Sequence, residues 1–159
     1  MKPIHYVAIV IILALVIGAF LLSPFSPLNK SSLNGKSIKL PTGYKIANST
    51  EKSIVITNGS DKMVIHSHSE RDVNEAVKQY KKDYGKKFNI TTKDFTLKSG
   101  EGVTKTTAQK INETTAEKLN DTKVVYRNWF LKNGKVYDIQ TFDTKPANEE
   151  TMKTIISSM

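Results

Sequence analysis

The chain has 159 residues, no cysteine and a formal net charge of +9, with twenty-two lysines and two arginines. Without cysteine, a disulfide framework and lipid attachment through a cysteine are both excluded. The lysine excess favours anionic lipid headgroups or acidic polymers as partners, or else forms only a solvated surface. Nucleic-acid binding is not expected, because the basic residues form no run of five or more and no aromatic–basic recognition motif is present.

An apolar segment dominates residues 1–25. No ionised side chain occurs from Pro3 to Leu22, and about twenty residues of helix span about 30 Å, the thickness of the hydrocarbon core of a bilayer. The segment therefore predicts an uncleaved, single-pass transmembrane anchor. The alternative is a cleaved signal peptide, but the apolar core is long for one, and Ser23 and Ser26 each precede a proline, which disfavours cleavage there.

Residues 26–36 are predicted to form a linker, since Pro24, Pro27 and several small polar residues stop the helix from continuing. One folded domain is expected over residues 37–159. Its first half predicts short strands over residues 37–40, 53–57 and 63–68. The last two are joined through Asn58-Gly59, a typical hairpin signal, in a loop of about four or five residues.

A helix is predicted after Asp72, which is a suitable N-cap with Glu75 three residues later. Apolar residues then recur at steps of three and four, which indicates one buried helix face. The predicted face consists of Val73, Ala76, Val77, Tyr80, Tyr84 and Phe88. Residues 89–123 carry weaker signals. A strand near Phe95 and Leu97 and an antiparallel partner over residues 103–111 are expected, followed by a polar loop.

The final third gives the clearest pattern. Strands over residues 124–131 and 136–142 flank Asn133-Gly134, a two-residue type I′ turn. That turn sets the register and places Trp129 opposite Asp138 and Arg127 opposite Gln140. Both faces of this hairpin carry apolar side chains, so we expect it to be central in the sheet and covered on both sides.

A C-terminal helix is predicted to begin at Pro146, with an apolar stripe that includes Ile155 and Ile156. The predicted fold class is therefore α+β, an antiparallel sheet packed with a long central helix and a C-terminal helix.

Six Asn-x-Ser/Thr sequons occur, and they suggest a domain displayed outside the cytoplasm. The alternative is an Asn- and Thr-rich composition that creates such triplets by chance. The candidate glycosylation sites are Asn29, Asn48, Asn58, Asn89, Asn112 and Asn120.

Several segments resemble PsbP-like domains. The similarity covers Leu40-Pro41-x-Gly43-Tyr44, the helix Asn74-Glu75-Ala76-Val77-x-x-Tyr80, the late hairpin around Asn133-Gly134 and the terminal helix ending at Met159. The order of elements over residues 37–159 is also similar to that of small membrane-anchored archaeal proteins of this fold. The resemblance implies an α-β-α sandwich around an antiparallel sheet, and it carries over no functional residues.

Two groups of residues are candidate binding sites. The first is the polar set on one face of the late hairpin, which we interpret as a small ligand-binding patch or as a structural ion pair. It consists of Arg127, Trp129, Asp138 and Gln140. The second is the alternating set His66, His68 and Glu70, whose imidazole and carboxylate groups are ligands for Zn²⁺ or Cu²⁺. The alternative for this second set is the polar outer face of an edge strand.

No nucleophile motif, phosphate-binding loop or calcium loop is present, so neither catalysis nor a cofactor is expected. The sequence favours a non-enzymatic accessory domain, anchored in the cell membrane with its C-terminal domain outside the cytoplasm. Its expected partner is a protein or an anionic envelope polymer. The alternatives are a small ligand-binding envelope protein that uses Asp138 and Arg127, and a metal-binding one that uses His66 and His68.

Overall fold

The computed structural model describes residues 32–33, 35–112, 124–142 and 145–159. The chain divides into two compact units, residues 1–30 and residues 31–159, and the described residues belong to the second. The predicted anchor over residues 1–25 and the sequons at Asn29 and Asn120 lie outside the described residues. Within the described ranges, no helix is long and apolar enough to cross a membrane.

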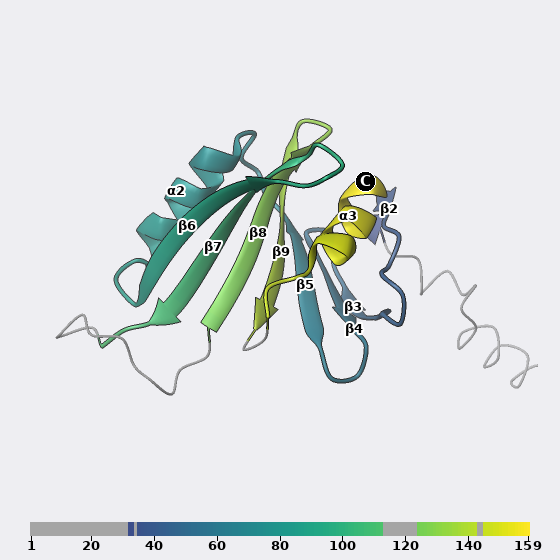
Figure 1. The fold of residues 1–159 in the computed structure, drawn as a ribbon, viewed down its shortest axis with the longest axis horizontal. Coiled ribbons are helices and arrows are strands. Elements are labelled where there is room, and N and C mark those ends of the chain that lie inside the picture. The colour runs from purple at the N-terminus through teal and green to yellow at the C-terminus, as the bar shows by residue number, and fades with distance from the viewer. Residues whose placement is uncertain (1–31, 34, 113–123, 143–144) are drawn as a thin grey trace, which may run out of the picture. The chain divides into compact units, whose positions relative to one another are not determined.

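The second unit has an α+β fold (Figure 1), as the sequence predicted. Its centre is a seven-stranded sheet in the order β3-β4-β5-β9-β8-β7-β6, and all neighbouring strands are antiparallel. The strands of this sheet are β3 (Lys45–Ser49), β4 (Ser53–Thr57), β5 (Lys62–Ser67), β6 (Phe88–Thr96), β7 (Gly102–Lys110), β8 (Val124–Lys132) and β9 (Lys135–Phe142). The remaining elements are the two-stranded hairpin of β1 (Ser32–Leu33) and β2 (Lys36–Ser37), and the helices α2 (Val73–Tyr84) and α3 (Glu149–Ser157).

The β8–β9 hairpin has the predicted register and lies in the middle of the sheet. Trp129 is opposite Asp138, and Arg127 is opposite Gln140. The turn residues Asn133 and Gly134 have φ values of 52° and 73°, the left-handed conformation that a type I′ turn requires. A two-residue turn allows only one pairing of the two strands, so the register could be predicted from the sequence alone.

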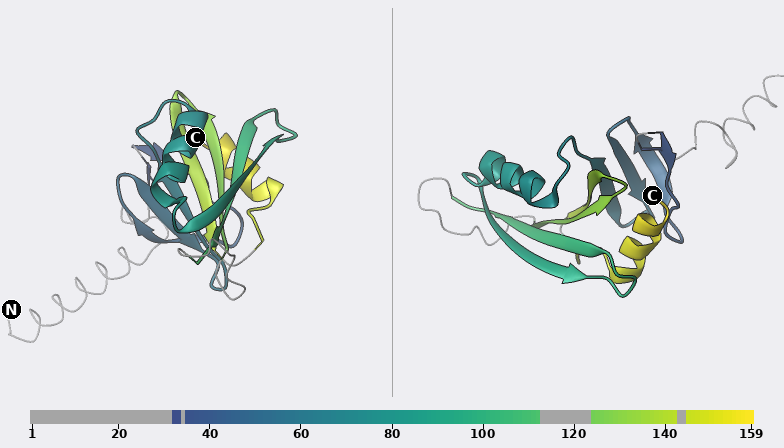
Figure 2. Two further views of the ribbon diagram at one scale, coloured as in Figure 1. Left: turned by 90° about the vertical axis from the view of Figure 1, so that its left-hand side faces the viewer. Right: turned by 90° about the horizontal axis from the view of Figure 1, so that it is seen from above.

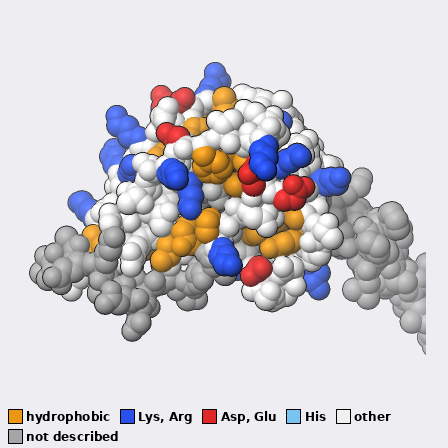
Figure 3. Space-filling model, viewed as in Figure 1, with side chains coloured by type: hydrophobic (Ala, Val, Ile, Leu, Met, Phe, Trp, Pro, Cys, Tyr) orange, Lys and Arg blue, Asp and Glu red, His pale blue; other side chains and the backbone are white. Residues whose placement is uncertain are grey.

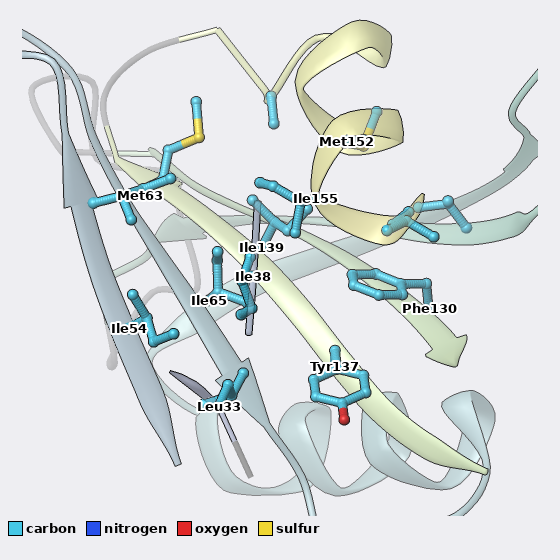
Figure 4. Close-up of a cluster of buried hydrophobic side chains, with 14 of the residues drawn as sticks. Leu33, Ile38, Ile54, Met63, Ile65, Phe130, Tyr137, Ile139, Met152 and Ile155 are labelled. Carbon is cyan, nitrogen blue, oxygen red and sulfur yellow. The ribbon is translucent and has the colours of Figure 1, made fainter. Parts of the chain in front are cut away.

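The two helices cover opposite faces of the sheet, as the two views in Figure 2 show. Neighbouring residues of a strand point to opposite faces, so Phe130 packs toward α3 and Trp129 toward α2. The α3-side core contains Ile54, Ile56, Ile65, Phe130, Tyr137, Ile139, Met152, Ile155 and Ile156 (Figure 4). The α2-side core contains Ala76, Val77, Tyr80, Ala108, Trp129 and Val136.

Helix α2 begins as predicted, because the carboxylate of Asp72 accepts hydrogen bonds from the backbone N–H groups of Asn74 and Glu75. The predicted apolar face is wrong at its C-terminal end. Tyr84 is 46% exposed, and Phe88 is the first residue of β6 rather than part of the helix. Gly85 caps the helix at the point where the chain turns back toward the sheet.

The β4–β5 hairpin is confirmed, with Thr57 paired to Lys62 across a four-residue loop. Strand β3 was not predicted. It is an edge strand in which only Ile46 is half-buried, and an irregularity between Ile46 and Asn48 breaks the alternation that marks a strand. An edge strand with both faces largely exposed needs no apolar pattern, so its sequence gives little signal.

Both ends of the domain also differ in detail from the prediction. The strand predicted over residues 37–40 is only the short β2 (Lys36–Ser37). Leu33, in the predicted linker, is 1% exposed and belongs to the α3-side core. Helix α3 begins after the N-cap Asn148, so Pro146 precedes the helix instead of starting it.

Candidate functional site

The predicted polar patch lies on the face of the sheet that α2 covers. Asp138 of β9 is paired with Trp129 of β8 on one side and with His66 of β5 on the other. Directly opposed residues of antiparallel strands place their side chains on the same face, so these three residues form one row across the sheet. Arg127 and Gln140, also opposite each other, lie two positions along the strands on the same face.

Asp138 is the centre of this polar cluster. Its side chain is 0% exposed, and its Oδ1 lies 2.6 Å from His68 Nε2 and 3.5 Å from Arg127 Nη1. A buried carboxylate is strongly unfavourable unless cations or hydrogen-bond donors compensate for its lost hydration. Arg127 supplies the permanent charge, and His68 supplies a short hydrogen bond.

Aromatic rings hold the two partners of Asp138 in place. The guanidinium of Arg127 lies 4.7 Å from the centroid of the Tyr80 ring and 5.5 Å from that of Trp129. The rings of His68 and Trp129 are 4.9 Å apart, centroid to centroid. Trp129 is itself fixed, because its Nε1 donates a hydrogen bond of 3.0 Å to Thr106 Oγ1. Cation–π and ring–ring contacts therefore restrict the orientations that both partners can adopt.

Three buried polar atoms of the cluster have no hydrogen-bond partner within the part of the chain that the structure describes. They are Asp138 Oδ2, Arg127 Nε and Gln140 Oε1. Two of these atoms are acceptors and one is a donor. Bound water or a small polar group supplies donors and acceptors of the kind that such atoms need.

Burial also affects the titratable groups around Asp138. Burial lowers the pKa of His66, and the nearby charges of Arg127 and His68 act in the same direction, whereas the Asp138 carboxylate opposes them. Burial likewise raises the pKa of Tyr80. Both shifts favour the uncharged form of the group at neutral pH.

The three predicted metal ligands do not form a shared strand face. Strand β5 ends at Ser67, so His68 and Glu70 belong to the segment that leads into α2. The ring centroids of His66 and His68 are 6.3 Å apart, and His68 Nε2 is already bonded to Asp138. Among the described residues, no three His, Asp or Glu side chains are grouped closely enough to hold a metal ion.

The structure brings all four residues of the predicted ligand patch together, and it adds His68 as a partner that the ligand patch did not include. A hollow of about 650 Å³ lies beside the cluster and is lined in part by His68 and Glu70, but Arg127 and Asp138 do not line it. The link from His68 to Asp138 depends on the pairing of β5 with β9. Nothing in the two strand sequences specifies that pairing, so the sequence could not show it.

A second feature is a group of lysines, here called the basic surface, at the C-terminal end of α2. Its members are all exposed and are Lys81, Lys82, Lys86, Lys87 and Lys110. The first two lie in the last turn of the helix. Lys110 is brought to them because it pairs with Phe88 at the start of β6, and because the N–H of Ile111 donates to the carbonyl of Lys87.

The basic surface has few compensating charges among the described residues. Asp83 lies within it, and its carboxylate accepts a hydrogen bond from Gln79. Lys and Arg side chains are visible along the left-hand margin of Figure 3, the side on which Figure 1 places α2 and the start of β6. A hollow of about 440 Å³ adjoins the surface, with Lys81, Phe88 and Ile90 among its lining residues. Positive charge beside apolar side chains is a combination that suits an anionic partner.

The predicted sequons within the described ranges are all exposed. They are Asn48, Asn58, Asn89 and Asn112. Asn58 also shapes the β4–β5 turn, where its Oδ1 accepts a hydrogen bond of 2.8 Å from the N–H of Asp61.

No model of a known protein family matches the sequence, and no curated protein matches it either.

Proposed function

We propose that the chain is a non-enzymatic, membrane-anchored domain that binds an anionic polymer of the cell envelope through the basic surface. The observation that carries this proposal is the gathering of five exposed lysines where α2, β6 and β7 meet, with only Asp83 among them in the described residues. Like charges held close together destabilise the folded domain unless a partner neutralises them. An anionic polymer carries many negative charges and can therefore neutralise several of these lysines at once.

Two further expectations belong to the same proposal. The apolar segment of residues 1–25 anchors the chain, and the domain lies on the outer side of the membrane. Exposed sequons support this location, because a glycan can be attached only where the asparagine is accessible. A sheet with one helix on each face is also compatible with the α-β-α sandwich of the PsbP-like domains that the sequence resembles.

The closed geometry around Asp138 supports a binding role rather than an enzymatic one. A general acid or base must reach its substrate within hydrogen-bond distance. The Asp138 side chain is 0% exposed, and its Oδ1 is already engaged by His68 and Arg127. These groups link the sheet to α2 in a polar network, and neither Asp138 nor Arg127 lines the neighbouring hollow.

Retention on immobilised polygalacturonate tests the proposal. We expect the full-length chain, kept in a neutral detergent, to bind at low salt and to elute by about 0.3 M NaCl, where the Debye length falls to about 6 Å. The variant Lys82→Gln/Lys86→Gln/Lys87→Gln should elute at clearly lower salt, because it removes three charges from the basic surface.

The matched control removes three lysines elsewhere. Lys45→Gln/Lys62→Gln/Lys153→Gln lowers the formal net charge by the same amount, from +9 to +6, at exposed positions outside the basic surface. It should elute with the unmodified chain. Equal losses in the two variants would mean that only total charge matters, and the proposal would fail. Separately, external protease should degrade the domain in intact cells, and complete protection would contradict the outward orientation.

A second candidate function is the binding of a small polar ligand beside Arg127, Asp138 and Gln140. The three unpartnered buried atoms of these residues favour it. Native mass spectrometry of the purified full-length chain should then show a bound species that Gln140→Leu releases. Identical spectra for the two chains would exclude a retained ligand at this position.

A further inference from the structure

We infer that the hollow beside His68 binds a small oxyanion, a phosphate or carboxylate group carried by a free metabolite or by the end of a polymer. The hollow has a volume of about 650 Å³ and is separate from the basic surface, which lies at the other end of α2. Its size falls within the range of small-molecule sites in proteins. The inference goes beyond the proposed function and does not depend on it.

Three cationic side chains from separate segments line this hollow. Lys52 precedes β4, Arg71 lies just before α2, and Lys135 is the first residue of β9. Among the described residues that line the hollow, Glu70 is the only acidic one, so their formal charge is +2 without any contribution from His68. A positive lining disfavours a divalent cation, which the sequence suggested here, and favours an anion.

Backbone hydrogen bonds fix these segments relative to one another. The N–H of Ser67 donates to the carbonyl of Lys52 at 2.9 Å, and the N–H of His68 donates to the carbonyl of Val136 at 2.9 Å. The backbone positions of Lys52 and Lys135 are therefore set by pairing with β5 and the residue that follows it. None of the three cationic side chains has an ion-pair partner among the described residues.

His68, which also lines the hollow, is held in one orientation by two contacts. His68 is 22% exposed, and Asp138 holds its Nε2 while Trp129 packs against its ring. Ser67, whose hydroxyl can donate a hydrogen bond, also lines the hollow, whereas the hydroxyl of Ser69 donates to Glu70 Oε2 at 3.4 Å. Three cationic side chains and a hydroxyl donor therefore line one hollow, and an oxyanion can accept hydrogen bonds from such a set.

Titration of the isotope-labelled full-length chain in neutral detergent, followed by ¹H–¹⁵N NMR, tests the inference. Sodium phosphate and sodium glucuronate are the two probes, and NaCl at equal ionic strength is the reference. We expect saturable shifts of the Ser67, Ser69 and Gly134 amides with at least one probe, with a dissociation constant of about 1 mM. Phosphate and glucuronate distinguish the two ligand chemistries. Shifts no larger than those in NaCl for both probes would overturn the inference.

Matched variants distinguish binding in the hollow from an effect of the protein's net charge. Lys52→Gln/Lys135→Gln should raise the dissociation constant about tenfold, since it removes two charge-assisted contacts. Lys45→Gln/Lys153→Gln removes the same charge at exposed positions that belong neither to the hollow nor to the basic surface, and should leave the constant unchanged. An equal rise in both variants would also overturn the inference. Because Lys52 and Lys135 lie outside the basic surface, this result is independent of retention on polygalacturonate.

Discussion

Replacing Asp138 by asparagine should strongly destabilise the domain, although the two side chains have nearly the same shape. The substitution keeps an oxygen that can accept the hydrogen bond from His68 Nε2, but it removes the negative charge that compensates Arg127. Arg127 is only 17% exposed, so water cannot replace the lost carboxylate effectively. A buried cation without a counter-charge is less stable than a buried ion pair.

The magnitude follows from the geometry of the pair. At the 3.5 Å that separates Arg127 Nη1 from Asp138 Oδ1, Coulomb's law with an effective dielectric constant of about 20 gives an attraction of about 5 kcal/mol. The loss of this attraction is partly offset, because burying the neutral asparagine costs less desolvation free energy than burying a carboxylate. We therefore expect Asp138→Asn to lower the free energy of unfolding by about 3 kcal/mol and the melting temperature by about 10 °C.

Urea unfolding monitored by tryptophan fluorescence gives a direct measurement. Trp129 is the only tryptophan in the chain, and its ring is in contact with the cluster. Asp94→Asn is the control, because Asp94 is exposed and its Oδ1 accepts a hydrogen bond of 2.6 Å from Thr104. Asp94→Asn should lower the free energy of unfolding by less than about 1 kcal/mol.

A double-mutant cycle separates the ion pair from other effects. Arg127→Met combined with Asp138→Asn removes both charges, so its cost should be smaller than the sum of the two single costs by about 1.5 kcal/mol or more. A cost below about 1 kcal/mol for Asp138→Asn, or additive costs in the cycle, would refute the view that Arg127 and Asp138 form a buried, coupled pair.

Three further outcomes follow from the described contacts. Gly134→Ala should cost about 1 kcal/mol in urea unfolding, because φ is 73° there, whereas Gly102→Ala, whose added Cβ meets no atom within 4 Å, should be nearly neutral. Thr106→Val should cost about 1–3 kcal/mol, since it leaves the buried Nε1 of Trp129 without an acceptor, and a loss below about 0.5 kcal/mol would contradict the hydrogen bond. Burial lowers the pKa of His66, so the stability gained by keeping it neutral is complete above its ordinary value of 6.5 and is lost as the pH falls through its lowered folded pKa. His66→Gln should therefore reduce the loss of stability between about pH 7.5 and pH 5.5, and an unchanged pH profile would show that His66 does not contribute to it.

Much of the fold could be predicted from local sequence patterns. The two-residue turn at Asn133-Gly134 determined both the β8–β9 hairpin and its register. The start of α2 followed from Asp72, whose side chain caps the helix as predicted. Such features depend on residues a few positions apart, so their physical causes are contained in short stretches of sequence.

The prediction was weaker where a residue's environment is set from a distance. The apolar spacing extended the predicted helix face to Tyr84 and Phe88, but the chain turns at Gly85, and Phe88 is the first residue of a strand. Strand β3 was missed because its partner is β4 alone and its residues are largely exposed. In both cases the local structure depends on packing against other elements, and the periodicity of apolar residues carries no information about that packing.

By itself, the sequence determined that Arg127, Trp129, Asp138 and Gln140 share one face of a central hairpin, because alternation and a tight turn leave only one register. Only the tertiary structure decided that His68, 70 residues before Asp138, contacts its carboxylate and lines a hollow with three cationic side chains. That contact depends on β5 pairing with β9, and such a long-range pairing is selected by the joint packing of all the strands and both helices rather than by any local sequence signal.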